Sequence, residues 1–452
     1  MVAEKGRNSL ALLAGLALLV TAISAWLSPG WIPRILFVLS GGLVIAQHLS
    51  TGRGLMLMAP TFWLGQQAGL FYSVIPALIE WTWAGEGLWL PLHDAQMQAY
   101  FGSHVESEIM QFACLCLGAQ VALGLLCQPP VPVSSQEGMR LRWTSVLALG
   151  LAVICLSEWA VSRLSGPAAV QAALHLFIPG WMAAGMVVLT LQATWSGQWR
   201  PLLLVAPIAL GSQFLLWHGK HPLYLLGTLL VLSALRRPFR SSLRIMGLAV
   251  IALPLLLAGV TMARYELNYV GMDMSTSQRT ATLVRYVLVA KLLKRQSESA
   301  ACLADVLAEH GADGVGEPWY WAAALVPRVL WPEKPSLSLG SDYAVAYCGY
   351  APEDVDRGGA GVHSASITLL GQPVIHGGLA GLRLAEAGLI LTLAGAAVLA
   401  RRHPAGLAAM AAMMPWLMDF DQDFALYLAL AVKTLLLQSP ILLFAGWCWR
   451  RL

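Results

Sequence analysis

Runs of apolar residues, each near or above the length of a membrane crossing, recur along the whole 452-residue chain. A transmembrane helix needs about 20 such residues. Hydrophobic residues make up 58% of the sequence and charged residues only 12%, against roughly a quarter in ordinary soluble domains. The alternating ten-residue segments of a membrane β-barrel are not found in the sequence. The sequence therefore predicts an all-α polytopic membrane protein.

Twelve spans are predicted from these runs. They are placed at residues 8–27, 31–49, 55–79, 105–127, 143–161, 168–193, 201–217, 221–235, 243–262, 378–400, 404–418 and 424–446. The first span follows Lys5 and Arg7, and no small-residue cleavage site separates it from the second. We therefore expect a retained helix rather than a removed signal peptide.

Basic residues are unevenly distributed among the connections between these spans. If the N-terminus is inside, every alternate connection is cationic, and this set holds fourteen of the 28 Lys and Arg residues. Cytoplasmic flanks retain Lys and Arg, whereas short translocated loops lose them. Both termini are therefore expected in the cytoplasm. The sorting also accounts for the net charge of +4 without nucleic-acid binding.

The longest connection, residues 263–377, is expected on the outer side, between a nine-span bundle at 1–262 and three C-terminal spans at 378–452. Two of its segments have the pattern of membrane-surface elements: amphipathic TATLVRYVLVAKLLKRQ, and EPWYWAAALVPRVLWP, which is too short to cross. The second would hold Arg328 and Lys334 at headgroup depth. There they either bind the phosphates of a lipid-linked substrate or snorkel to ordinary headgroups.

Three strings in and around this loop resemble the Wzy-type polymerases of O-antigen and exopolysaccharide. They are VPRVLWPEKPSLSLG, then HSASITLLGQPVIHGGLAGL, and the earlier turn WHGKHPLYLLGTLLVLSALRR. The resemblance covers about residues 217–390. One departure concerns a candidate base, because relatives often have Gly-Glu where this chain has Gly371-Gln372.

The resemblance implies a glycosyltransferase at the periplasmic face of the bacterial inner membrane. Such an enzyme transfers a growing glycan from undecaprenyl pyrophosphate to a newly flipped repeat unit on the same carrier, with no cofactor and no metal. The implied partners are the lipid-linked donor and acceptor and the bilayer, with a flippase and a chain-length regulator as further candidates. Two alternatives stay open: the related O-antigen ligase and, in a different class, a secondary transporter.

This transfer needs positive charge for the departing pyrophosphate and a base for the attacking hydroxyl. For the charge, Arg328 is the first candidate, and the others are Arg264, Arg279, Arg285, Lys334 and Lys220. For the base we favour His363, which lies in the glycine-rich string GGAGVHSAS, with Asp342 second; His376 is a further ionisable group of the region. A purely structural histidine is the alternative.

The remaining candidates are cysteines and charges outside this set. Cys302 and Cys348 share the outer loop, so an oxidising periplasm permits a disulfide between them. Arg383 and Glu386, three residues apart on one helix face, are predicted to pair, with Lys433 as a further partner across the bundle. Arg34 is expected to snorkel at a span end. The string DFDQD, residues 419–423, is expected to cap the next helix, with a catalytic role as the alternative.

Overall fold

The computed structural model describes residues 2–51, 54–78, 103–126, 140–163, 168–216, 221–234, 244, 295–317, 320–326, 330–334, 340–350 and 366–450. The ordered elements in these ranges are all helices. In the first half they are α1 (Val2–Leu27), α2 (Trp31–Ser50), η1 (Gly54–Met58), α3 (Pro60–Gln66), the π-helical η2 (Gln67–Val74), α6 (His104–Leu126), α7 (Arg140–Arg163), α8 (Ala168–Ser196), α9 (Arg200–Leu216) and α10 (His221–Ala234). The second half holds α13 (Arg295–His310), α14 (Tyr320–Leu325), α15 (Gly340–Tyr347), α17 (Thr368–Ala400), α18 (Pro404–Leu417) and α19 (Phe424–Arg450).

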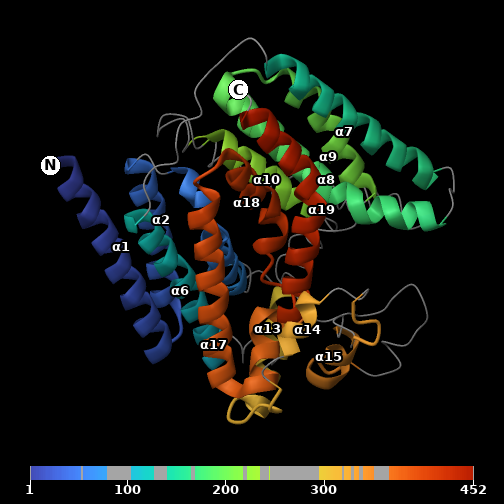
Figure 1. Ribbon diagram of the computed structural model, residues 1–452. Helices are drawn as coiled ribbons and strands as arrows, with labels where there is room; N and C mark the ends of the chain where they lie inside the picture. The colour runs from blue at the N-terminus through green and yellow to red at the C-terminus, as the bar shows by residue number, and fades with distance from the viewer. Residues whose placement is uncertain are drawn as a thin grey trace, which may run out of the picture.

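The two termini lie at one end of the helical bundle, and α13, α14 and α15 lie at the other (Figure 1). Helix α1 packs against α2 and α6, and α18 packs against α8 and α19. Helix α13 contacts α17, α15, α6 and η2, while α14 contacts α19. Helices α13 and α14 therefore pack directly on the end of the bundle, and α15 packs on α13.

Seven helical stretches among the described residues are long and apolar enough to cross a membrane. They are Ser9–Leu27, Trp31–Ser50, His104–Leu126, Trp143–Val161, Phe177–Ser196, Thr368–Ala400 and Phe424–Trp449. Three further predicted spans fall on the shorter helices α9, α10 and α18, and residues 55–79 fall on a series of short helical segments. The predicted span 243–262 lies outside the described residues except for Arg244. A helical membrane protein is thus supported, and the predicted count of twelve spans is not confirmed.

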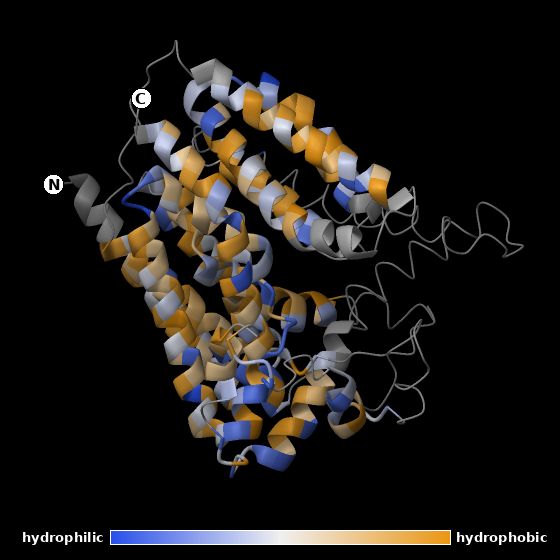
Figure 2. Ribbon diagram, turned by 45° about the vertical axis from the view of Figure 1, so that its right-hand side comes forward, coloured by the Kyte–Doolittle hydropathy of each residue, from blue (hydrophilic) through white to orange (hydrophobic). Residues whose placement is uncertain are grey.

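The outer surface of the long helices is apolar, as a lipid-facing surface must be. Large hydrophobic side chains point outward along α1 and α7, for example Leu12, Leu16, Val146 and Leu149. Figure 2 shows orange, hydrophobic ribbon along these helices, and more blue, hydrophilic ribbon at the end that carries α13 to α15. In the part of the chain that the structure describes, the end that carries α13 to α15 is thus more polar than the long helices.

Charged side chains inside the bundle pair with one another near the N-terminal end of α6. Arg34 donates two hydrogen bonds of 2.8 Å to the Glu106 carboxylate, and both side chains are almost fully buried. The prediction that Arg34 snorkels is therefore wrong, because its partner lies on a helix 72 residues further along the chain. A buried charge is costly unless it is paired in this way.

Arg383 and Glu386 pair as the sequence predicts, with a 2.9 Å hydrogen bond, and Arg383 also donates to Glu108 of α6. These contacts link α17 to α6. The suggested third partner, Lys433, instead lines a cavity between other helices.

Candidate functional site

Helix α17 is broken at Gly378, whose φ of 58° and ψ of −160° lie outside the helical region. Such a backbone conformation favours glycine, because other residues clash there. The segment before the break, residues 368–377, is buried from Thr368 to Ile375. The segment after the break, from Leu379 to Ala400, runs from the end of the bundle that carries α13 toward the end that carries the termini (Figure 1). The short buried segment before the break therefore ends beside α13.

The turn after α13 crosses this break at close range. Val315 N donates to Ile375 O over 2.8 Å, Gly316 N donates to His376 O over 3.1 Å, and Leu379 N donates to Gly311 O over 3.1 Å. A Cβ atom at Gly314 would collide with the backbone of residues 376–378. The glycines of both segments thus permit a backbone contact that satisfies polar groups freed by the break.

His376 lies at the end of the inner segment, stacked on the ring of Tyr320. The two ring centroids are 4.2 Å apart and the planes differ by 14°. The Glu317 carboxylate lies 3.9 Å from His376 Nδ1, and the His376 side chain keeps 17% exposure. Burial raises the pKa of Tyr320, so its hydroxyl stays protonated.

Two polar atoms of this group make no hydrogen bond within the described residues: the Tyr320 hydroxyl and His376 Nδ1. Nearly all buried polar atoms in proteins are hydrogen-bonded, so each exception needs an explanation such as a water or a ligand. A titratable imidazole with an acid and a phenol beside it has the composition of a proton-transfer site.

Gln372 forms a second polar group, in the middle of the inner segment. Its Nε2 donates to the Tyr343 hydroxyl over 2.7 Å, and its Oε1 accepts from Ala425 N over 2.7 Å. The first N–H groups of a helix have no partner within the helix. Gln372 therefore caps α19 from a distant segment and links it to α15, a role for which a neutral amide, with donor and acceptor, is suited.

The DFDQD turn precedes α19, and its three aspartates are all buried. Asp421 accepts from Ser299 of α13 over 3.1 Å, and Asp423 accepts from Ile367 N over 3.4 Å. The expected cap is not formed by the Asp423 carboxylate, which holds the start of α17 instead. Burial raises the pKa of Asp423 to about 7; the nearby Asp421 charge raises it too, and the Ile367 N–H opposes both.

The sequence predicted a disulfide between Cys302 and Cys348, and the structure joins these two residues. Cys302 lies in α13 and Cys348 directly follows α15, so the bond closes a loop that contains α14. Lys334 lies in the same loop. Its side chain is buried, and its ammonium donates to the carbonyls of Val326 at 2.9 Å and Ala324 at 3.4 Å. These contacts tie Lys334 to the end of α14.

The structure places some of the predicted site residues. Asp342 is exposed in the first turn of α15, next to buried Tyr343. Six of the predicted residues lie outside the described residues: His363, Arg328, Arg264, Arg279, Arg285 and Lys220. Tyr320 and Glu317 are the residues of this site that the sequence did not single out. His376 and Asp423 were among the ionisable groups considered, and Gln372 was noted as standing where relatives often have a glutamate.

Within the described ranges no three His, Cys, Asp or Glu side chains are placed to hold a metal ion. Comparison of the chain with protein-family models, with curated proteins and with solved structures found no match.

Proposed function

We propose that this protein is a Wzy-type lipid-linked glycan polymerase of the bacterial inner membrane. It would extend O-antigen or exopolysaccharide at the periplasmic face, using undecaprenyl-pyrophosphate-linked repeat units as donor and acceptor. The resemblance of residues 326–340 and 363–382 to that family supports the proposal. So do His376 and Glu317 after α13, and Asp421 bonded to Ser299 of α13. These helices lie at the end of the bundle opposite the termini (Figure 1).

In this proposal His376 accepts the proton of the attacking sugar hydroxyl. The observation that carries the assignment is its geometry: a partly exposed imidazole, stacked on Tyr320, with Nδ1 unbonded within the described residues and 3.9 Å from Glu317. A carboxylate near the ring stabilises the imidazolium that forms when the proton is taken up. The Tyr320 ring holds the imidazole in one orientation.

The reaction then balances without a further reactant. The acceptor oxygen forms the new glycosidic bond as the bond between the anomeric carbon and the phosphate oxygen breaks, and the electron pair leaves with undecaprenyl pyrophosphate. That charge is proposed to be stabilised by Arg328, with Arg264, Arg279, Arg285 and Lys220. A guanidinium group makes paired hydrogen bonds to phosphate oxygens, and the lysine adds a further positive charge. Lys334 is assigned to holding its own segment, since its ammonium already bonds two carbonyls.

The test is complementation of a strain that lacks the gene, with surface polysaccharide resolved on a gel. His376→Asn is expected to lower the yield of long chains by about 10²-fold or more, because a positioned acid or base usually accelerates a reaction by at least that factor. A matched control is His104→Gln, an exposed histidine at the start of α6. Immunoblotting verifies equal protein levels.

The gel also separates the candidate activities. Loss of length with single-repeat capping retained supports a polymerase. Loss of all capping would instead indicate the ligase activity. Normal polysaccharide in the deletion strain, or normal chain length with His376→Asn, would refute the proposal.

A further inference from the structure

A cavity of about 180 Å³ lies between α8, α9, α10, α18 and α19, apart from the site described above. One bound water needs only about 10–15 Å³ of such space, so the cavity has room for a larger occupant. Its lining is mostly apolar and includes Met182, Leu225, Leu430 and Leu437. The polar exceptions are few and come from different helices.

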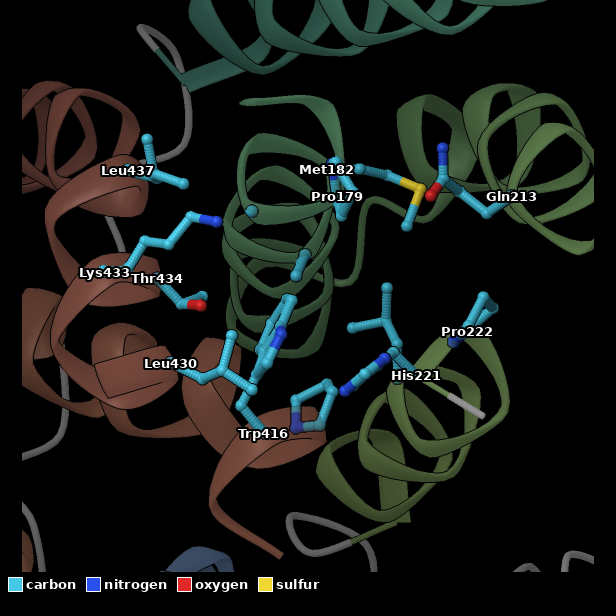
Figure 3. Close-up of a pocket in the computed structure, with 14 residues that line it drawn as sticks. Pro179, Met182, Gln213, His221, Pro222, Trp416, Leu430, Lys433, Thr434 and Leu437 are labelled. Atoms are coloured by element: carbon cyan, nitrogen blue, oxygen red, sulfur yellow. The ribbon is translucent and has the colours of Figure 1, made fainter. Parts of the chain in front are cut away.

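Lys433 of α19 is the cation of this cavity. Figure 3 shows its side chain extending from α19 toward α8, with Thr434 beside it. Lys433 is the tenth residue of α19, which places it about 14 Å along the helix at 1.5 Å per residue. It therefore lies within a membrane-crossing stretch, where an ionisable residue is costly and usually serves a binding or transport role.

No acid lies within ion-pair distance of Lys433 in the part of the chain that the structure describes, and none lines the cavity. The polar groups that share the lining are the Thr434 hydroxyl, the Gln213 amide and His221. The Gln213 Nε2 already donates to Glu158 over 3.0 Å. Lys433 is exposed where the cavity opens to the surface of the helices, and an anionic occupant would balance its ammonium there.

An aromatic pair lies at the other end of the cavity. The His221 ring lies 5.4 Å from the Trp416 ring, with the two planes 24° apart. These residues come from the start of α10 and the end of α18, near the start of α19. The cavity thus extends from these two rings to Lys433 in the apolar stretch of α19.

We infer that this cavity binds the phosphate group of a lipid, with the phosphate on Lys433 and Thr434 and the first part of the tail along the apolar lining. An ammonium makes charge-assisted hydrogen bonds to phosphate oxygens, and a hydroxyl adds a donor. The apolar side chains favour a tail over a free ion. Either a polyprenyl phosphate or a membrane phospholipid has this chemistry. The inference does not depend on the proposed polymerase activity.

The test is native mass spectrometry of the full chain in detergent. The protein is titrated separately with decaprenyl phosphate, phosphatidylglycerol, their uncharged counterparts decaprenol and diacylglycerol, and inorganic phosphate. One equivalent of a phosphate-bearing lipid is expected to bind at least about tenfold more tightly than its uncharged counterpart. Preference for decaprenyl phosphate identifies a polyprenyl carrier as the source, and preference for phosphatidylglycerol identifies membrane phospholipid.

Variants of α19 locate the site. Lys433→Gln is expected to weaken lipid binding about tenfold or more, whereas Lys433→Arg retains it. The matched control is Leu436→Gln, which adds the same side chain to the same helix at an exposed position outside the lining. Unchanged binding by a folded Lys433→Gln protein would overturn the inference. So would tight binding of the uncharged lipids, or of inorganic phosphate at the affinity of the lipids. If Lys433→Gln fails to fold, the comparison of charged with uncharged lipids on the natural chain decides.

Discussion

Removing the disulfide between Cys302 and Cys348 is expected to loosen α13, α14 and α15 without unfolding the bundle. The bond joins α13 to the end of α15 over a sequence separation of 46 residues. Helix α15 is also held by packing on α13, by burial of Tyr343, and by two side-chain hydrogen bonds within the described residues. The Tyr343 hydroxyl bonds Gln372, and the Tyr347 hydroxyl bonds His310 of α13 over 2.9 Å. The variants are Cys302→Ser, Cys348→Ser and the double variant.

The magnitude follows from loop closure. For a loop of 46 residues, the chain-entropy model gives about 4 kcal/mol at 25 °C. At 1.4 kcal/mol per factor of ten, this loss raises the population of the opened state on the order of a thousandfold. The free energy of opening is therefore expected to fall by about that amount in α15 and little in α1 or α6.

Hydrogen exchange of the detergent-solubilised protein measures these opening free energies segment by segment. Either single variant is expected to match the double variant, because one substitution already breaks the bond. The control is Cys155→Ser, at a buried free cysteine of α7. Equal exchange of α15 in the natural chain and in both single variants would refute the reasoning, and so would additive effects of the two substitutions.

Two further predictions concern buried charges. Glu106→Gln leaves Arg34 buried without its carboxylate and is expected to lower the free energy of unfolding, measured in mixed micelles, by about 3–5 kcal/mol. The double variant Arg34→Met with Glu106→Leu is expected to recover most of this loss. Equal losses in the two variants would contradict the pairing. Asp423 has a pKa of about 7 in the folded protein, above the unfolded value near 4. Its contribution to stability is therefore full below about pH 4 and is lost as the pH rises toward 7. Asp423→Asn is expected to remove that part of the pH dependence of unfolding, and an unchanged profile would contradict it.

Local patterns in the sequence predicted what depends on neighbours along the chain. Apolar length predicted the membrane helices, and i,i+3 spacing predicted the pair between Arg383 and Glu386. The disulfide followed from a shared compartment and a short list of cysteines. The bilayer thickness sets the length of a membrane helix, the helical pitch brings residues i and i+3 together, and an oxidising compartment permits cysteines to pair. Each of these causes can be applied from the sequence alone.

Contacts between distant segments were not predicted, because no local pattern specifies them. Arg34 meets Glu106 across 72 residues, and Gln372 reaches the N-terminus of α19 across 53. The predicted span began at residue 378, so the helical segment 368–377 before the break was wrongly assigned to the outer loop. Gly377 and Gly378, together with Gly311 and Gly314, were the local signal in the sequence that two backbone segments cross closely here.

The side of the membrane on which the turn after α13 lies tests the account most directly. Val315 belongs to this turn, close to His376, and the residue is 62% exposed. In cells with a permeabilised outer membrane, Val315→Cys is expected to react with a membrane-impermeant maleimide, while the natural chain gives the background. Labelling that appears only after the inner membrane is lysed would place this end of the bundle in the cytoplasm and contradict the proposed periplasmic site.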